Sequence, residues 1–208
     1  MILYSKYTLH PWHGVEPGKS APQLVNAFIE IVPTDTVKYE VDKASGWLKV
    51  DRPQQFSNIV PALYGFIPQT LCDIQTGEYC MSKTGRTGII GDQDPIDVVV
   101  LSEKTFPTSA FLMQVVPIGG FRMIDKNEAD DKIIAVMKDD AVYGHYTDIT
   151  QVEPGIIKRL QHYFLTYKDM PGTTGKTVEI ADVYGAAEAQ EIIVCSLNDY
   201  RNRFTNEQ

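Results

Sequence analysis

The feature that most limits the fold of this chain is a series of short strand-like segments, with helical patterns only near its C-terminal end. Residues 37–42 alternate apolar with charged side chains, the period of a strand that is buried on one face. A turn at 43–46 and a return at 47–50 then complete a hairpin. Further strands are predicted at 25–32, 96–101, 111–118, 121–124 and 132–137.

Two amphipathic helices are predicted at 154–168 and 186–204, where apolar residues recur at helical spacing. Many short strands followed by two helices predict an α+β fold, in which antiparallel strands form a barrel and helices pack outside it. Residues 71–91 contain four glycines and no clear periodicity, so we expect a long loop excursion there. Residues 1–24 are expected to be irregular. No domain boundary stands out, so 1–208 is expected to be one domain.

Composition narrows the range of partners and the cellular compartment. The 27 acidic and 19 basic residues give a net charge of −8, whereas a protein that binds nucleic acid normally has a basic surface. An anionic substrate remains possible if metal ions accompany it. No apolar run reaches the roughly 20 residues of a membrane span, and the N-terminus lacks a signal-peptide pattern. Three scattered cysteines fit reduced thiols. We therefore expect a cytoplasmic protein that binds neither nucleic acid nor membrane.

The strongest local motif is an acidic cluster, Asp92, Asp94 and Asp97, directly before a run of valines. Carboxylate oxygens are the ligands that Mg²⁺ and Ca²⁺ prefer, and Pro95 favours a turn that would let the side chains converge. An EF-hand is excluded by spacing, because position 6 counted from Asp92 is Asp97 and that position requires glycine. A solvated acidic loop remains the simpler alternative.

Three other segments carry charged or hydroxyl groups that could join this motif. The segment 125–132 is acidic, although taken alone it is typical of an exposed hairpin loop. Strand alternation places Lys38 and Glu40 on one face, with Glu30 in the preceding strand. The helix predicted at 154–168 ends in Tyr167 and Lys168, which place a phenol beside an ammonium group.

Taken together, these motifs resemble the signature of family I soluble inorganic pyrophosphatases. The likeness runs from about Ile29 to Lys168 and rests on many short motifs in order, so chance is a poor explanation. The matching residues are Glu30, Lys38 to Lys43, Gly46, Val50 to Arg52, Pro61, Tyr64 to Ile67, Asp92, Asp94, Pro95, Asp97, Pro117 to Gly119, Asp125, Asp130 to Lys132, His162 to Phe164, Tyr167 and Lys168.

The resemblance implies a closed five-stranded antiparallel OB-like barrel with flanking helices. It implies hydrolysis of pyrophosphate to two phosphates by a metal-activated water, with several Mg²⁺ ions per site. Asp94 would be the general base, and the metal ligands would be Asp92, Asp97, Asp125 and Asp130. The substrate-binding residues would be Lys38, Arg52, Tyr64, Lys132, Tyr167 and Lys168. Glu30 and Glu40 would support the cavity.

The chemistry of the substrate agrees with this set, because an acidic cavity repels pyrophosphate unless cations neutralise it. One departure concerns Val60, where the family commonly has a tyrosine, so one hydroxyl contact is expected to be missing. The resemblance also implies a homo-oligomer, with a hexamer favoured over a dimer. Two alternatives remain open: another metal-dependent phosphohydrolase that acts on nucleotides, and a non-enzymatic OB-like or metal-binding module.

Overall fold

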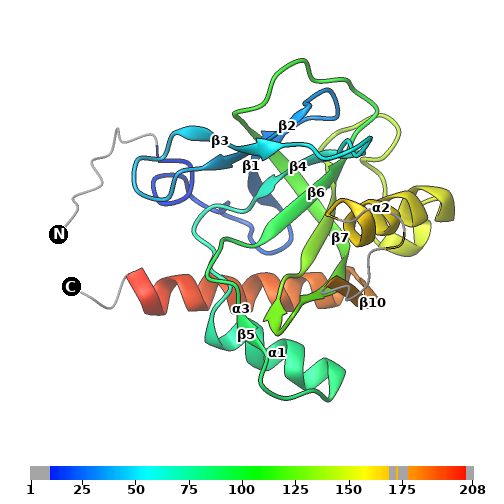
Figure 1. Ribbon diagram of the computed structural model, residues 1–208. Coiled ribbons are helices and arrows are strands. Elements are labelled where there is room, and N and C mark those ends of the chain that lie inside the picture. The colour runs from blue at the N-terminus through cyan, green and yellow to red at the C-terminus, as the bar shows by residue number, and fades with distance from the viewer. Residues whose placement is uncertain (1–9, 169–171, 173–177, 205–208) are drawn as a thin grey trace.

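The computed structural model describes residues 10–168, 172 and 178–204, and their elements are arranged as in Figure 1. Residues 1–9 of the predicted irregular segment lie outside this part of the chain, whereas 10–24 form turns and one isolated bridge. The described strands are β1 (Val25–Ile31), β2 (Val37–Val41), β3 (Leu48–Pro53), β4 (Leu63–Phe66), β5 (Ile90–Gly91), β6 (Asp97–Leu101), β7 (Phe111–Asp125), β8 (Glu128–Ala129), β9 (Lys132–Met137) and β10 (Val178–Gly185). The helices are α1 (Ile74–Thr84), a 3₁₀ turn η1 (Ile149–Gln151), α2 (Pro154–Thr166) and α3 (Ala186–Phe204).

The sheet is mixed, so the prediction of purely antiparallel strands is wrong. Most neighbours are antiparallel, but β6 pairs with β9 in parallel and β5 pairs with β8 in parallel. A parallel pair needs a long crossover connection, and β7 supplies it between β6 and β9 by running antiparallel to β9. Hydrogen bonding passes through β1, β4, β6, β9 and β7 and returns to β1. The hairpin β2–β3 forms a separate two-stranded sheet.

The core lies where the strands bury near-continuous apolar runs. The valines of β6 and the Ile133–Val136 stretch of β9 are almost completely shielded from solvent. Strand β4 must cross β1 at very short range, and Gly65 permits this. A Cβ atom at Gly65 would lie 1.8 Å from the carbonyl oxygen of Phe28, a distance that no side chain tolerates.

Strand β7 is one 15-residue strand, where the sequence predicted two strands separated near Gly119 and Gly120. An irregularity between Pro117 and Gly119 bends the strand without ending it. The glycines do not break the pairing, because they are needed for close packing. A Cβ at Gly120 would lie 2.4 Å from the phenol oxygen of Tyr184. The bent strand pairs with β1 through its first half and with β10 through its second half.

The segment 71–91 is not a plain loop, since residues Ile74–Thr84 form helix α1. Its apolar pattern is weak, which is why the helix was not predicted. A neighbouring helix fixes its start: the carboxylate of Asp199 in α3 accepts the backbone N–H groups of Asp73, Gln75 and Thr76. These donors would otherwise have no partner at the first turn. The helix ends at Gly85, which has a φ of 68°.

Helices α2 and α3 confirm the two amphipathic patterns, and α3 has the bounds that were predicted. Figure 1 shows α3 and α1 on one side of the sheet, the β2–β3 hairpin on the opposite side, and α2 beside β7 and β10. Strand β10, which was not predicted, leads directly into α3. None of the helices that the structure describes combines the length and the apolar character that a bilayer crossing needs.

Candidate active site

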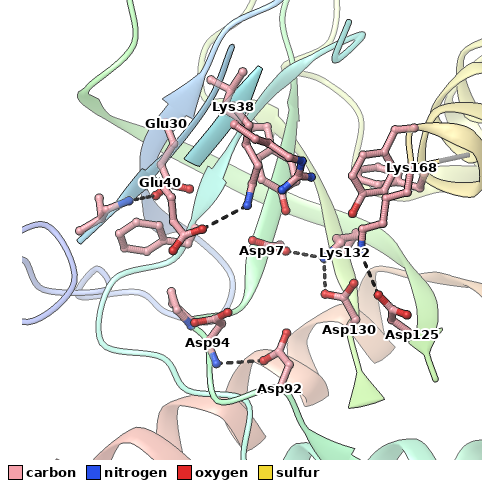
Figure 2. Close-up of a pocket in the computed structure, with 18 of the residues that line it drawn as sticks. Glu30, Lys38, Glu40, Asp92, Asp94, Asp97, Asp125, Asp130, Lys132 and Lys168 are labelled. Carbon is pink, nitrogen blue, oxygen red and sulfur yellow. Dashed lines mark hydrogen bonds and ion pairs between the residues drawn. The ribbon is translucent and has the colours of Figure 1, made fainter. Parts of the chain in front are cut away.

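A cavity of about 250 Å³ lies between the β2–β3 hairpin, the start of β6 and the C-terminal end of α2. All thirteen residues predicted for the site line it, although they come from distant parts of the chain. Figure 2 shows the labelled carboxylates and lysines converging on a common space. The predicted set is Glu30, Lys38, Glu40, Arg52, Tyr64, Asp92, Asp94, Asp97, Asp125, Asp130, Lys132, Tyr167 and Lys168.

The loop that carries Asp92 and Asp94 is held by backbone contacts. The carboxylate of Asp92 accepts the N–H of Asp94 at 3.0 Å, and the carbonyl of Asp94 accepts the N–H of Cys72 at 2.8 Å. Between them Gln93 has a φ of 63°, in the left-handed region. Its side chain donates to Asp73 at 2.8 Å, so the start of the α1 segment helps to hold this turn. The acidic loop is therefore shaped before any ligand arrives.

Strand register brings the next carboxylates together. Asp97 begins β6 and lies opposite Lys132 at the start of β9, with Asp130 two residues earlier. The ammonium group of Lys132 contacts both Asp97 and Asp130, and only 3% of Lys132 is exposed. Burial opposes the charge of Lys132, but Asp130 and Asp97 overcome it and raise its pKa well above the ordinary value. The lysine thus stays charged between the two carboxylates.

The acidic hairpin that joins β7 to β9 faces the cavity and is not merely an exposed loop. Asp125, the last residue of β7, accepts a hydrogen bond from Lys168 at 2.8 Å, as Figure 2 shows. The ammonium of Lys168 also lies 5.3 Å from the ring centroid of Tyr167. This contact joins the end of α2 to the acidic wall.

The opposite wall is the β2–β3 hairpin. Lys38 lies opposite Arg52 in its register, and the ammonium of Lys38 is 3.2 Å from Glu40 and 3.1 Å from Asp51. The guanidinium carbon of Arg52 lies 5.8 Å from the ring centroid of Tyr167 in α2. Glu30 connects this hairpin to β1, since its carboxylate accepts the N–H of Val41 at 2.7 Å.

Burial shifts two carboxyl groups strongly toward their neutral forms. Burial, followed by repulsion from Asp130, raises the pKa of Asp92 to about 8. Burial also raises the pKa of Glu30 to about 8, although the Val41 hydrogen bond opposes the shift. A cation near either group would reverse this preference, because it stabilises the ionised carboxylate.

Several lining residues were not predicted for the site. Lys43 contacts the carboxylate of Asp94 and donates to the carbonyl of Gln93 at 3.3 Å. Lys43 belongs to the matching segment Lys38 to Lys43, but nothing in the sequence indicates that it contacts residue 94. Trp12, Gln54, Glu128 and Tyr163 also line the cavity. Trp12, Gln54 and Glu128 lie outside the matching motifs, whereas Tyr163 lies within the matching 162–168 motif.

The charge of the cavity is negative even after internal pairing. Eight lining carboxylates face five lining cations. Among the residues that the structure describes, no three His, Cys, Asp or Glu side chains already form a metal-binding group. Lys132 accounts for this at Asp97 and Asp130, because its ammonium group occupies the space between them. The donors are all carboxylate oxygens, which suit a hard divalent cation.

Known proteins of one family are similar to this chain over most of its length. The inorganic pyrophosphatase family profile matches residues 27–201. The inorganic pyrophosphatase of Chlamydia trachomatis is 46% identical over 199 residues, which cover 94% of this chain and 95% of the relative. The soluble inorganic pyrophosphatase 2 of Chlamydomonas reinhardtii is 37% identical over 204 residues, which cover 98% and 95% of the two chains.

A solved structure agrees at the level of the fold. The inorganic pyrophosphatase of Thermus thermophilus superimposes with a TM-score of 0.75 at 29% identity, covering 90% of this chain and 97% of that one. The family match spans the strands, the acidic loop and the helix α2 that build the cavity. The chain belongs to the inorganic pyrophosphatase family, whose members hydrolyse pyrophosphate to two phosphates with the help of divalent metal ions.

Proposed function

We propose that the cavity of this pyrophosphatase works with several Mg²⁺ ions and that Asp94 is the general base. The observation that carries the proposal is the excess of carboxylates over cations around one cavity of about 250 Å³. Pyrophosphate is itself an anion, so such a space favours it only after cations have bound. The same cavity contains lysines and an arginine that suit phosphate oxygens.

Asp92, Asp97, Asp125 and Asp130 would hold the metal ions. Their oxygen-only donor set fits Mg²⁺, and burial and the nearby Asp130 raise the pKa of Asp92, a penalty on the ionised carboxylate that a bound cation would offset. Bound Mg²⁺ ions would lower the pKa of a water molecule and neutralise charge that develops on the phosphates. Lys132 would have to release Asp97 and Asp130 and turn toward the substrate.

Asp94 is the best placed carboxylate for accepting a proton. Half of its side chain is exposed, and its carboxylate contacts Lys43 rather than another acid. It lies on the same shaped loop as Asp92, so a water molecule held beside Asp92 would be close to it. A carboxylate that is not occupied in coordination is free to take the proton of the attacking water.

The substrate would be bound by cations and phenols around the acidic groups. Arg52 can donate two parallel hydrogen bonds to phosphate oxygens, which a lysine cannot do. Glu30 and Glu40 would keep the hairpin aligned, since they contact Val41 and Lys38. The complete substrate-binding set in this proposal is Lys38, Arg52, Tyr64, Lys132, Tyr167 and Lys168.

The proposal extends to the fold, the cellular compartment and the oligomeric state of the enzyme. The return of hydrogen bonding from β7 to β1 supports a closed five-stranded OB-like barrel within one domain of residues 1–208. The similarity to soluble pyrophosphatases and the three free thiols support a cytoplasmic enzyme without nucleic-acid or membrane partners. We also infer a homo-oligomer, with a hexamer favoured over a dimer. Sedimentation equilibrium tests this, and a monomer at micromolar concentration would contradict it.

The reaction is tested by measuring phosphate release from pyrophosphate, from ATP and from buffer alone, each with and without Mg²⁺. We expect release from pyrophosphate only with the metal, and much slower release from ATP. Faster release from ATP would favour a nucleotide phosphohydrolase. Absence of release at every divalent-metal concentration would favour a binding module and overturn the proposal.

The replacement of the family tyrosine by Val60 is expected to change affinity without abolishing the reaction. Val60 is 1% exposed, and it is not among the described residues that line the cavity. We expect the enzyme to be active with an altered KM for pyrophosphate or an altered affinity for the metal. Steady-state kinetics with Mg²⁺ check this, and a completely inactive protein would contradict it.

A further inference from the structure

One wall of the cavity carries two polar side chains, Tyr163 and Gln54, that are not in the proposed catalytic and substrate-binding set. Tyr163 and Tyr167 are one helical turn apart in α2, and both line the cavity. Their rings stack with centroids 5.3 Å apart and an angle of 22° between the planes. Because Tyr167 also faces the guanidinium of Arg52, the phenol of Tyr163 belongs to the same wall as the proposed phosphate-binding groups.

Gln54 is the second group on this wall. It follows Arg52 by two residues and also lines the cavity. Its amide nitrogen Nε2 is shielded from solvent and makes no hydrogen bond of full geometry with the described residues, although the Gln54 side chain interacts with the phenol of Tyr163. A buried donor that is not fully paired destabilises the folded protein by roughly 1–3 kcal/mol, so its presence in a cavity suggests that a ligand supplies a better acceptor.

The phenol of Tyr163 lies against the Gln54 side chain and can still donate its own proton to a ligand. Burial, followed by the nearby phenol of Tyr167, raises its pKa to about 12. The phenol therefore keeps its proton in the neutral pH range. The charges of Arg52 and Lys132 act on this oxygen, which places it in the cationic part of the cavity. A phosphate oxygen held by those cations would be the natural acceptor for a neutral donor.

We propose that Gln54 and Tyr163 form a neutral donor pair that binds a phosphoryl oxygen of pyrophosphate beside Arg52. This rests on the proposed role of Arg52 and Tyr167 in phosphate binding. Neutral donors add affinity for the substrate without adding to the positive charge that the metal ions already contribute.

The test uses two substitutions, each of which removes one donor and changes little else. Tyr163→Phe removes only the hydroxyl, and Gln54→Leu removes the amide at nearly constant volume. We expect the KM for pyrophosphate and the dissociation constant of phosphate to rise roughly tenfold in each variant, while kcat changes little. Binding of Mg²⁺ without substrate, measured by calorimetry, should be unchanged.

Thermal unfolding separates binding from a structural role. Gln54→Leu removes a buried donor that is not fully paired, so its melting temperature should equal or exceed that of the wild type. A lower melting temperature together with a normal KM would mean that Gln54 only supports the fold, and would overturn the proposal. Tyr146→Phe is the matched control, since it removes a phenol that is not among the lining residues.

Arg52→Ala distinguishes this inference from the proposed function. If Arg52→Ala weakens phosphate binding while Gln54→Leu and Tyr163→Phe both keep the wild-type KM, the donor pair is wrong and the phosphate site stands. If Arg52→Ala also binds phosphate normally, the assignment of this wall to the substrate fails as well. A raised KM in all three variants, with Tyr146→Phe unchanged, supports the proposal.

Discussion

Lys132 shows at the scale of single residues how the metal-free cavity tolerates its acidity. Its ammonium group is buried between Asp97 and Asp130, where we propose that metal ions bind. Two partly buried carboxylates on one ammonium group would repel each other without that cation. The lysine is therefore an internal counter-ion to both carboxylates.

Lys132→Met is expected to destabilise the metal-free protein by about 3 kcal/mol, because it leaves two partly buried carboxylates without their partner. Added Mg²⁺ should reduce this deficit. Urea unfolding with a chelator and with excess Mg²⁺ measures both values. Lys104→Met removes a largely exposed lysine paired with Glu103 and should cost little under either condition. An equal deficit with and without metal would argue against metal binding at these carboxylates.

Asp94→Asn is expected to lower kcat by about a hundredfold or more, because the amide cannot accept the proton of the attacking water. The affinity for Mg²⁺ should stay close to normal, since Asp94 is not among the proposed ligands. Stopped assays of phosphate release and metal titrations measure the two effects. Asp139→Asn, at a position with 83% of its side chain exposed, is the control. Normal turnover in Asp94→Asn would refute the assignment of the base.

At the scale of elements, helix α1 depends on a contact from α3. Its own residues have few apolar side chains on one face, and Gly77 lies in its middle. The carboxylate of Asp199 compensates by accepting three backbone N–H groups and the hydroxyl of Thr76. The helix therefore forms because another helix, more than a hundred residues later in the chain, completes its first turn.

Asp199→Ala is expected to lower the free energy of unfolding by about 1–3 kcal/mol, because several buried donors lose their acceptor. The change in kcat should be small, because Asp199 does not line the cavity. Urea unfolding and steady-state kinetics test both statements. Asn202→Ala, an exposed position on the same helix, should be nearly neutral. Unchanged stability in Asp199→Ala would show that α1 starts without this cap.

The elements that the sequence predicted are those with their own periodic pattern. Helices α2 and α3, the hairpin and strands β1, β6 and β9 belong to this group, whereas β4, β5, β8 and β10 were not predicted. Helix α1 was missed because its stability comes from a tertiary contact. Strand β7 was divided into two because glycines needed for close packing resemble a turn in sequence.

The same reasoning applies to the site. All predicted site residues lie within the matching motifs, where the spacing is specific. Lys43 and Tyr163 lie in those motifs too but were not assigned to the site, and Gln54 and Trp12 lie outside them, because the relation of these residues to the cavity arises only from packing between distant segments. Local patterns cannot encode such contacts, which depend on how the hairpin and the N-terminal segment fold back.

For the whole molecule, the acidic cavity makes stability depend on pH and metal together. The pKa of Glu30 is raised from 4.5 to about 8, so the folded state holds a proton that the unfolded state releases above about pH 4.5. The contribution of this group is full below that pH and is lost as the pH rises through about 8. Metal ions would oppose the loss by favouring the ionised cavity.

Glu30→Gln is expected to remove this pH dependence while keeping an acceptor for the N–H of Val41. In metal-free protein, the stability of the variant relative to wild type should therefore improve between pH 5 and pH 8. Urea midpoints at both pH values measure the difference, with Glu103→Gln, outside the cavity, as the control. A constant difference between variant and wild type at the two pH values would show that Glu30 does not titrate in this range.

The parallel pairing of β6 with β9 also limits how the chain can change in length. The register Asp97 to Lys132 sets the position of both residues and, two residues earlier, that of Asp130. Inserting one residue between Asp130 and Lys132 would turn the carboxylate to the other face of the strand. Insertions in the connection at 103–110 leave the register intact, since strands on both sides are already paired. We therefore expect this connection to tolerate an added residue better than the short turn before β9, which must keep its residue count.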